Sequence, residues 1–146
     1  FVGAGFLGFA HTLPQVNIWT HGTLVTAMHG HMAFWGAYGM IVFAMMSYAM
    51  PLLTGRKLYD SRAALWGFWG STIGMVAMTG AFAVAGVSQV VLERRVGLDF
   101  LVVQKEIEMH FIGLILAATL FTVAIGVFVY NFLRHGRPNA EAMETR

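Results

Sequence analysis

Cysteine is absent from the 146 residues, only three prolines occur, and only 11% of the residues are charged. Without cysteine the chain can form no disulfide, iron–sulfur cluster or thiolate site, so histidine, carboxylates and backbone groups are the available metal ligands. The low charge and the 58% content of apolar residues are typical of a membrane protein. The basic residues lie mostly between apolar runs, so the sequence indicates no nucleic-acid partner.

Charged residues divide the chain into four apolar segments. The first begins at Phe1 and is too short to cross the ~30 Å hydrocarbon core, so we expect a truncated helix whose remainder lies upstream. The other three are long enough to span a bilayer at ~1.5 Å per residue. The predicted fold class is all-α, a polytopic membrane helix bundle that forms the carboxyl-terminal fragment of one membrane domain. The expected helices cover about residues 1–13, 24–53, 63–92 and 105–134, with a solvated tail over 135–146.

Small residues recur at helical spacing in the third segment. Gly70 and Gly74 are continued by Ala77, Ala81 and Ala85. Such stripes let membrane helices approach closely. We therefore expect this stripe to face another helix.

Basic residues are distributed unevenly between the two ends of the predicted bundle. Six lie on one side: Arg56, Lys57, Arg62, Arg134, Arg137 and Arg146. Three lie on the other, where four acidic residues offset them: Arg94, Arg95 and Lys105. The positive-inside rule therefore places the loop over 54–62 and the tail in the cytoplasm, and the other end of the helices outside.

Two histidines interrupt the apolar stretch Thr26-Ala-Met-His-Gly-His-Met-Ala-Phe34. Residues two apart on an α-helix differ by roughly 200° in direction, so His29 and His31 face nearly opposite sides and serve two different sites. Gly30 leaves room for a bulky planar group, and two hemes, one on each face, fit this layout. The alternative is that the histidines are hydrogen-bonded packing residues of a membrane helix.

Further polar residues precede this helix between residues 11 and 23. His11 and His21 border a loop that also contains Gln15, Asn17 and Trp19. Location at the membrane interface explains these residues, and the same donors are suited to heme propionates. His110 and His135 stand beside charged residues at membrane boundaries and are interpreted as interfacial.

Three sequence blocks between His11 and Tyr38 resemble a known family. They are His11-Thr-Leu-Pro-Gln-Val-Asn17, Thr20-His-Gly-Thr23 and His29-Gly-His-Met-Ala-Phe-Trp-Gly-Ala-Tyr38. Together they resemble the carboxyl-terminal part of the large subunit of cytochrome c-dependent nitric oxide reductases, in the heme–copper oxidase superfamily. The later helices agree mainly in hydrophobic layout. The H-x-H pair by itself is shared across the superfamily.

The resemblance implies residue roles and a reaction. It implies that His29 is the proximal, catalytic ligand of a high-spin heme b3 and that His31 is an axial ligand of a low-spin heme b. It implies contacts to the heme propionates or pocket from His11, Thr12, Asn17 and His21. Two nitric oxide molecules, two electrons and two protons would give nitrous oxide and water at heme b3 and a neighbouring non-heme iron.

The resemblance also implies components beyond this chain. The ligands of the non-heme iron and the second histidine of heme b would lie upstream of Phe1, so the chain alone is expected to be inactive. A calcium ion is implied, although the loop over 11–23 offers no obvious carboxylate for it. The expected partners are a membrane-anchored cytochrome c subunit, the upstream helices and the lipid bilayer. The expected location is the bacterial inner membrane, with the heme end toward the periplasm.

Other functions remain open from the sequence. The chain could belong to a quinol-oxidising nitric oxide reductase or an oxygen-reducing oxidase, which the upstream metal ligands would distinguish. A b-type cytochrome that only relays electrons predicts two six-coordinate hemes. A non-redox membrane bundle predicts no heme absorbance.

Overall fold

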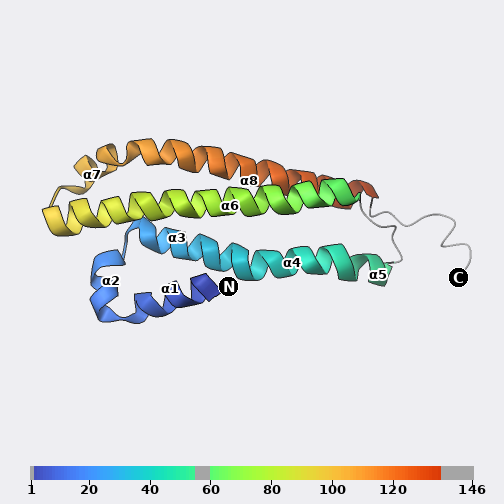
Figure 1. Cartoon of the computed structure of the whole chain (residues 1–146), viewed down its shortest axis with the longest axis horizontal. Coiled ribbons are helices and arrows are strands. Elements are labelled where there is room, and N and C mark those ends of the chain that lie inside the picture. Colours follow the sequence, from blue (N-terminus) through green and yellow to red (C-terminus); the bar gives the residue numbers. More distant parts are fainter. Residues whose placement is uncertain (1, 55–59, 136–146) are drawn as a thin grey trace, which may run out of the picture.

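The computed structural model describes residues 2–54 and 60–135, and within these ranges it contains helices and no strands (Figure 1). This architecture confirms the predicted all-α membrane bundle. The elements are α1 (Val2–Thr12), α2 (Pro14–Thr20), α3 (Leu24–Ala33), η1 (Phe34–Gly39), α4 (Met40–Ala44), η2 (Met45–Ala49), α5 (Met50–Thr54), α6 (Ser61–Val90), η3 (Val91–Val96), α7 (Phe100–Glu106) and α8 (Glu108–His135). The basic residues expected at 56, 57, 137 and 146, and the tail beyond residue 135, lie outside the described residues.

Among residues 2–54 and 60–135, three continuous helical rods are long and apolar enough to cross a membrane. They extend over Leu24–Leu53, Ser61–Val96 and Glu108–Arg134, which is 30, 36 and 27 residues. Figure 1 shows α6 and α8 side by side, with the rod from α3 to α5 along the other edge of α6. The rod that starts at Ser61 exceeds the ~20 residues needed for a span, so its charged end, η3, projects beyond the hydrocarbon core.

The rod from α3 to α5 contains two π-helical segments, η1 and η2. The second directly precedes the turn that contains Pro51, whose missing N–H removes one i→i−4 hydrogen bond. The first contains Trp35, which is buried, and a side chain at Gly39 would collide with its indole ring. The helix continues past the proline to Thr54.

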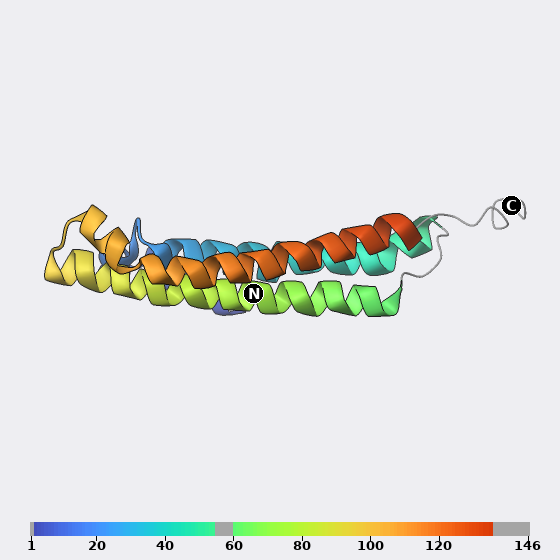
Figure 2. The same cartoon turned by 90° about the horizontal axis from the view of Figure 1, so that it is seen from above.

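Helices α6 and α8 run side by side (Figure 2), and glycines of α6 lie where the two helices touch. A Cβ atom at Gly70 would lie 2.8 Å from the Cβ of Ala124, and one at Gly74 would lie 2.7 Å from the backbone nitrogen of Phe121. The expected stripe therefore faces another helix at these glycines and is buried again at Ala85. Ala81 is half-buried and Ala77 is exposed among the residues that the structure describes.

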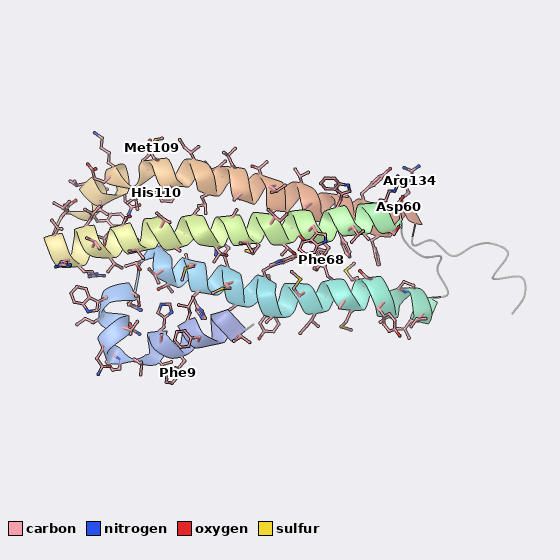
Figure 3. All side chains as sticks on the ribbon, viewed as in Figure 1. Phe9, Asp60, Phe68, Met109, His110 and Arg134 are labelled. Atoms are coloured by element: carbon pink, nitrogen blue, oxygen red, sulfur yellow. The ribbon has the colours of Figure 1, made fainter. Side chains whose placement is uncertain are left out.

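A reciprocal backbone-to-amide pair joins α6 and α8 at the end of the bundle where Asp60 and Arg134 lie (Figure 3). The backbone N–H of Asp60 donates to Oδ1 of Asn131 at 3.2 Å, and Nδ2 of Asn131 donates to the Asp60 carbonyl at 3.0 Å. Asn131 is only 2% exposed, so its side-chain amide needs hydrogen-bond partners inside the protein, and these two bonds supply them.

Two short helices differ from the expectation: α2 lies where the sequence indicates a loop, and α7 is separated from α8 where the sequence indicates one continuous helix. Helix α2 occupies most of the expected loop over 11–23 and begins at Pro14, whose fixed φ suits a first helical position. The helix expected over 105–134 is divided at Ile107, so that α7 precedes α8. Asp99 caps α7 by accepting a hydrogen bond from the backbone N–H of Leu101 at 3.0 Å.

Candidate heme site

The two histidines of α3 contact different helices. The ring of His29 lies against α1, with its centroid 5.4 Å from that of His11. The ring of His31 lies against α6, with its centroid 4.8 Å from that of Phe82. The two side chains therefore occupy separate environments, as the ~200° between residues two apart requires.

One nitrogen of His29 is buried without a partner. Within the described ranges, no group donates a hydrogen bond to its Nδ1 or accepts one from it. Gly8 makes the burial possible, because a Cβ atom there would lie only 3.0 Å from Cε1 of the ring. A buried polar atom in this state calls for an ion, a metal or a water as its partner. The Nε1 of Trp35 is in the same state, but an indole N–H can only donate, whereas an imidazole nitrogen can also ligate a metal, so His29 keeps a possible ligand atom unused by the protein.

His31 shows the hydrogen bond expected of a metal ligand. Its Nδ1 lies 2.8 Å from the carbonyl oxygen of Ala27. In the tautomer that carries the proton on Nδ1, this atom donates to the carbonyl and Nε2 presents its lone pair to a metal. The ring is exposed, so this lone pair can be reached.

The space beside His31 has apolar walls. A groove of about 370 Å³ is lined by Ala27, Gly30, His31, Phe34 and Met75. Nothing lies within 4 Å of the position that a Cβ atom of Gly30 would take. Apolar walls with one coordinating nitrogen suit a planar, largely apolar cofactor such as heme.

The four residues expected to contact the heme propionates lie from the end of α1 to the end of α2, and the structure divides them into two groups. His11 and Asn17 meet, because Nδ2 of Asn17 donates to the His11 carbonyl at 2.9 Å, and His11 in turn contacts His29. Thr12 is exposed, and its hydroxyl donates to the carbonyl of Phe9 at 2.7 Å. His21 is exposed at the end of α2. The structure thus brings His11 and Asn17, but neither Thr12 nor His21, to the side of α3 that carries His29.

His110 is separate from this site in the fold. It lies beside Met109 at the end of the bundle near α7 (Figure 3), and its Nδ1 is 3.2 Å from the Ile107 carbonyl. It is half-buried and shares no ring contact with the histidines of α3.

The start of α3 is held by residues that sequence reasoning did not select for the site. The Thr23 hydroxyl accepts a hydrogen bond from the backbone N–H of Val25 at 3.3 Å and donates to the Thr20 carbonyl at 2.7 Å. Gln89 of α6 accepts a hydrogen bond from the backbone N–H of Leu24 at 2.9 Å. A single buried glutamine on an apolar helix is the only sequence signal for this contact.

No three His, Asp or Glu side chains among residues 2–54 and 60–135 converge on a common point. Each candidate therefore offers one protein ligand. A heme brings four nitrogen ligands of its own and needs only axial ligands from the protein, so the donor set fits heme on each side of α3.

Comparison with known proteins identifies the family. The profile of the family described as Cytochrome C and Quinol oxidase polypeptide I matches residues 1–122. The chain belongs to this family, in the heme–copper oxidase superfamily. Membership implies heme cofactors in a membrane protein, and together with the nitric oxide reductase relative described next it confirms the resemblance drawn from the residues.

Three curated relatives show how far the similarity extends. The chain is 42% identical over 145 residues to a nitric oxide reductase subunit of Stutzerimonas stutzeri, covering 94% of this chain and 31% of the relative. It is 36% identical over 92 residues to a cytochrome c oxidase subunit 1 homolog of Agrobacterium tumefaciens (strain T37), covering 62% of this chain and 17% of the relative. It is 34% identical over 102 residues to cytochrome c oxidase subunit 1 of Rhodobacter capsulatus, covering 65% and 19%. The chain thus spans less than a third of the length of each.

Proposed function

We propose that this chain is the heme-binding, carboxyl-terminal part of a membrane nitric oxide reductase that reduces nitric oxide to nitrous oxide with electrons from a cytochrome c. The observation that carries the proposal is the placement of His29 and His31 on one helix but against different helices, α1 and α6. The similarity to the nitric oxide reductase relative over 94% of the chain supports this substrate.

In this proposal His29 holds the iron of a high-spin heme b3 and His31 holds that of a low-spin heme b. When bound, the hemes and a non-heme iron supply electron transfer and the binding of nitric oxide. The unpartnered nitrogen of His29 and the apolar groove beside His31 support two separate heme sites, and the family resemblance supports which heme belongs to which histidine. The ligands of the non-heme iron and the second histidine of heme b belong to segments outside this chain.

The residues of α3 would place the two hemes and tune one of them. Two residues advance only ~3 Å along a helix, so one rigid segment sets the relative position of both imidazoles. The hydrogen bond from His31 to the Ala27 carbonyl fixes the orientation of the ring and raises the basicity of its other nitrogen. The apolar walls of the groove would pack against a cofactor bound on that face and, with it in place, lower its access to water.

The proposed surroundings follow from the charge distribution and the family. The basic loop and the basic tail face the cytoplasm, so the end of the rods that carries α2 and η3 faces the periplasm of a bacterial inner membrane. A membrane-anchored cytochrome c subunit delivers electrons on that side. His11, Asn17, Thr12 and His21 lie at this end, where heme propionates would be held, and the loop over 11–23 has no carboxylate for the implied calcium ion.

An oxygen-reducing oxidase is the second candidate function. Two of the three relatives are named as cytochrome c oxidase subunit 1 or its homolog, at 34% and 36% identity. Both functions use the same two axial histidines, so the structure of α3 supports either. A quinol-oxidising nitric oxide reductase differs only in its electron donor, and an electron-relay b-type cytochrome would have no ligand-binding heme.

The deciding experiment uses the full-length protein in its native complex. We expect reduced protein to show one low-spin heme and one high-spin heme, and only the high-spin heme to change its absorption spectrum when nitric oxide is added. Steady-state assays with reduced cytochrome c should show consumption of nitric oxide and release of nitrous oxide. Turnover of oxygen alone would favour the oxidase, and two six-coordinate hemes would favour the electron relay.

A further inference from the structure

A buried glutamine attaches α6 to the first turn of α3. Gln89 is 3% exposed, and its Oε1 accepts a hydrogen bond from the backbone N–H of Leu24 at 2.9 Å. Its Nε2 donates to Oε1 of Glu93 at 2.9 Å. This second bond orients the amide so that its oxygen points to α3. The first turn of a helix has N–H groups without partners inside the helix, and here another helix supplies one acceptor.

A glycine brings the two backbones together beside this bond. A Cβ atom at Gly86 would lie 2.5 Å from the backbone nitrogen of Val25 and 2.9 Å from the carbonyl carbon of Leu24. Any side chain at this position would push the start of α3 away from α6. Gln89 and Gly86 together therefore fix where the first turn of α3 lies along α6 and how this turn is rotated about the axis of α3.

The same two helices touch again at the heme-ligand candidate. The Phe82 ring contacts the His31 ring at 4.8 Å. Phe82 and Gln89 are seven residues apart on α6, and Leu24 and His31 are seven apart on α3, so both contacts follow one line along an antiparallel helix pair. Two helical turns separate the contacts, a distance over which an α-helix behaves as a rigid rod.

We propose that Gln89 is a positioning residue for the axial histidines of α3, acting through Leu24 on the helix and not on a heme itself. The proposal rests on the proposed function, because it concerns the imidazoles that would ligate the hemes. The position and orientation of an axial ligand tune the electronic state of a heme iron. Loss of the acceptor at residue 89 should therefore alter the low-spin heme while leaving both ligands in place.

The test uses electron paramagnetic resonance of the full-length, heme-loaded complex. Gln89→Leu keeps the approximate size of the side chain and removes both hydrogen bonds. The paired exchange of Gln89→Glu with Glu93→Gln keeps an acceptor for Leu24 and reverses donor and acceptor in the second bond. Asn131→Leu is the matched control, because it removes another buried amide that joins α6 to its neighbour at the opposite end of the bundle.

We expect Gln89→Leu to shift the g values of the low-spin heme at full heme content, and the paired exchange to restore them. Asn131→Leu should lower stability and leave the g values unchanged. Native g values in Gln89→Leu would overturn the proposal, as would altered values in the paired exchange. If Gln89→Leu fails to assemble, the paired exchange decides by the same criterion. A wild-type complex without a low-spin heme would instead overturn the proposed function.

Discussion

The contact between α6 and α8 at Gly74 permits a quantitative test of the bundle. In Gly74→Ala the new methyl group would lie 2.7 Å from the backbone nitrogen of Phe121, 2.8 Å from its Cα and 2.9 Å from its Cβ. None of these atoms can rotate away, so the helices must separate. Overpacking of this kind costs about 1–3 kcal/mol. We expect a value in the upper half of that range, about 2–3 kcal/mol, because backbone atoms form the obstacle.

Gly80→Ala is the matched control on the same helix. Nothing lies within 4 Å of the position that its Cβ atom would take. Both substitutions gain the same helix propensity, about 1 kcal/mol, so this gain cancels when the two variants are compared. The difference between their unfolding free energies therefore isolates the contact with Phe121.

The assay is SDS-induced unfolding of the purified full-length protein in mixed micelles, followed by circular dichroism. We expect Gly74→Ala to be less stable than Gly80→Ala by about 2–3 kcal/mol. Equal stability of the two variants would refute the close packing of α6 against α8 at this glycine.

Three further predictions concern the orientation in the membrane, the activity of residues 1–146 on their own, and the hydrogen-bonded pair of Asn131 with Asp60. A membrane-impermeant thiol reagent should label Ser61→Cys only from the cytoplasmic side and Val96→Cys only from the periplasmic side, and the reverse pattern would invert the proposed topology. Residues 1–146 expressed alone should show no nitric oxide turnover, so steady-state reduction by this piece would contradict the assignment of the missing ligands to other segments. Asn131→Leu should lower the unfolding free energy by about 1–3 kcal/mol, because it leaves the backbone N–H and carbonyl of Asp60 without this buried partner; an unchanged value would show that water replaces the amide.

The fold class could be predicted from the sequence because long uncharged segments in an apolar chain have few options. In a bilayer every backbone polar group must be satisfied within the protein, so such segments form helices. The start of α2 at Pro14 and the break at Ile107 cannot be predicted in this way, because the residues at these boundaries, Leu13 and Ile107, are apolar and make no side-chain cap that would mark a helix end.

The site could be predicted only in part. The separation of His29 from His31 follows from 3.6 residues per turn, and the structure places their rings against α1 and α6 accordingly. The neighbours of these rings, Gly8 and Phe82, depend on which helices pack together. The Gln89 contact joins residues 65 positions apart, and no local pattern encodes such a pairing.

The measurement that tests the account most directly compares His29→Ala with His31→Ala in the full-length complex by optical and electron paramagnetic resonance spectroscopy. His29→Ala should remove or perturb the high-spin, ligand-binding heme and abolish turnover, while the low-spin signal persists. His31→Ala should erode the low-spin signal and block electron delivery, while chemically reduced protein still binds carbon monoxide at a high-spin heme. Exchanged losses would reverse only the assignment of the two histidines. Loss of the same heme in both variants, with the other heme intact, would contradict the claim that one helix serves two heme sites.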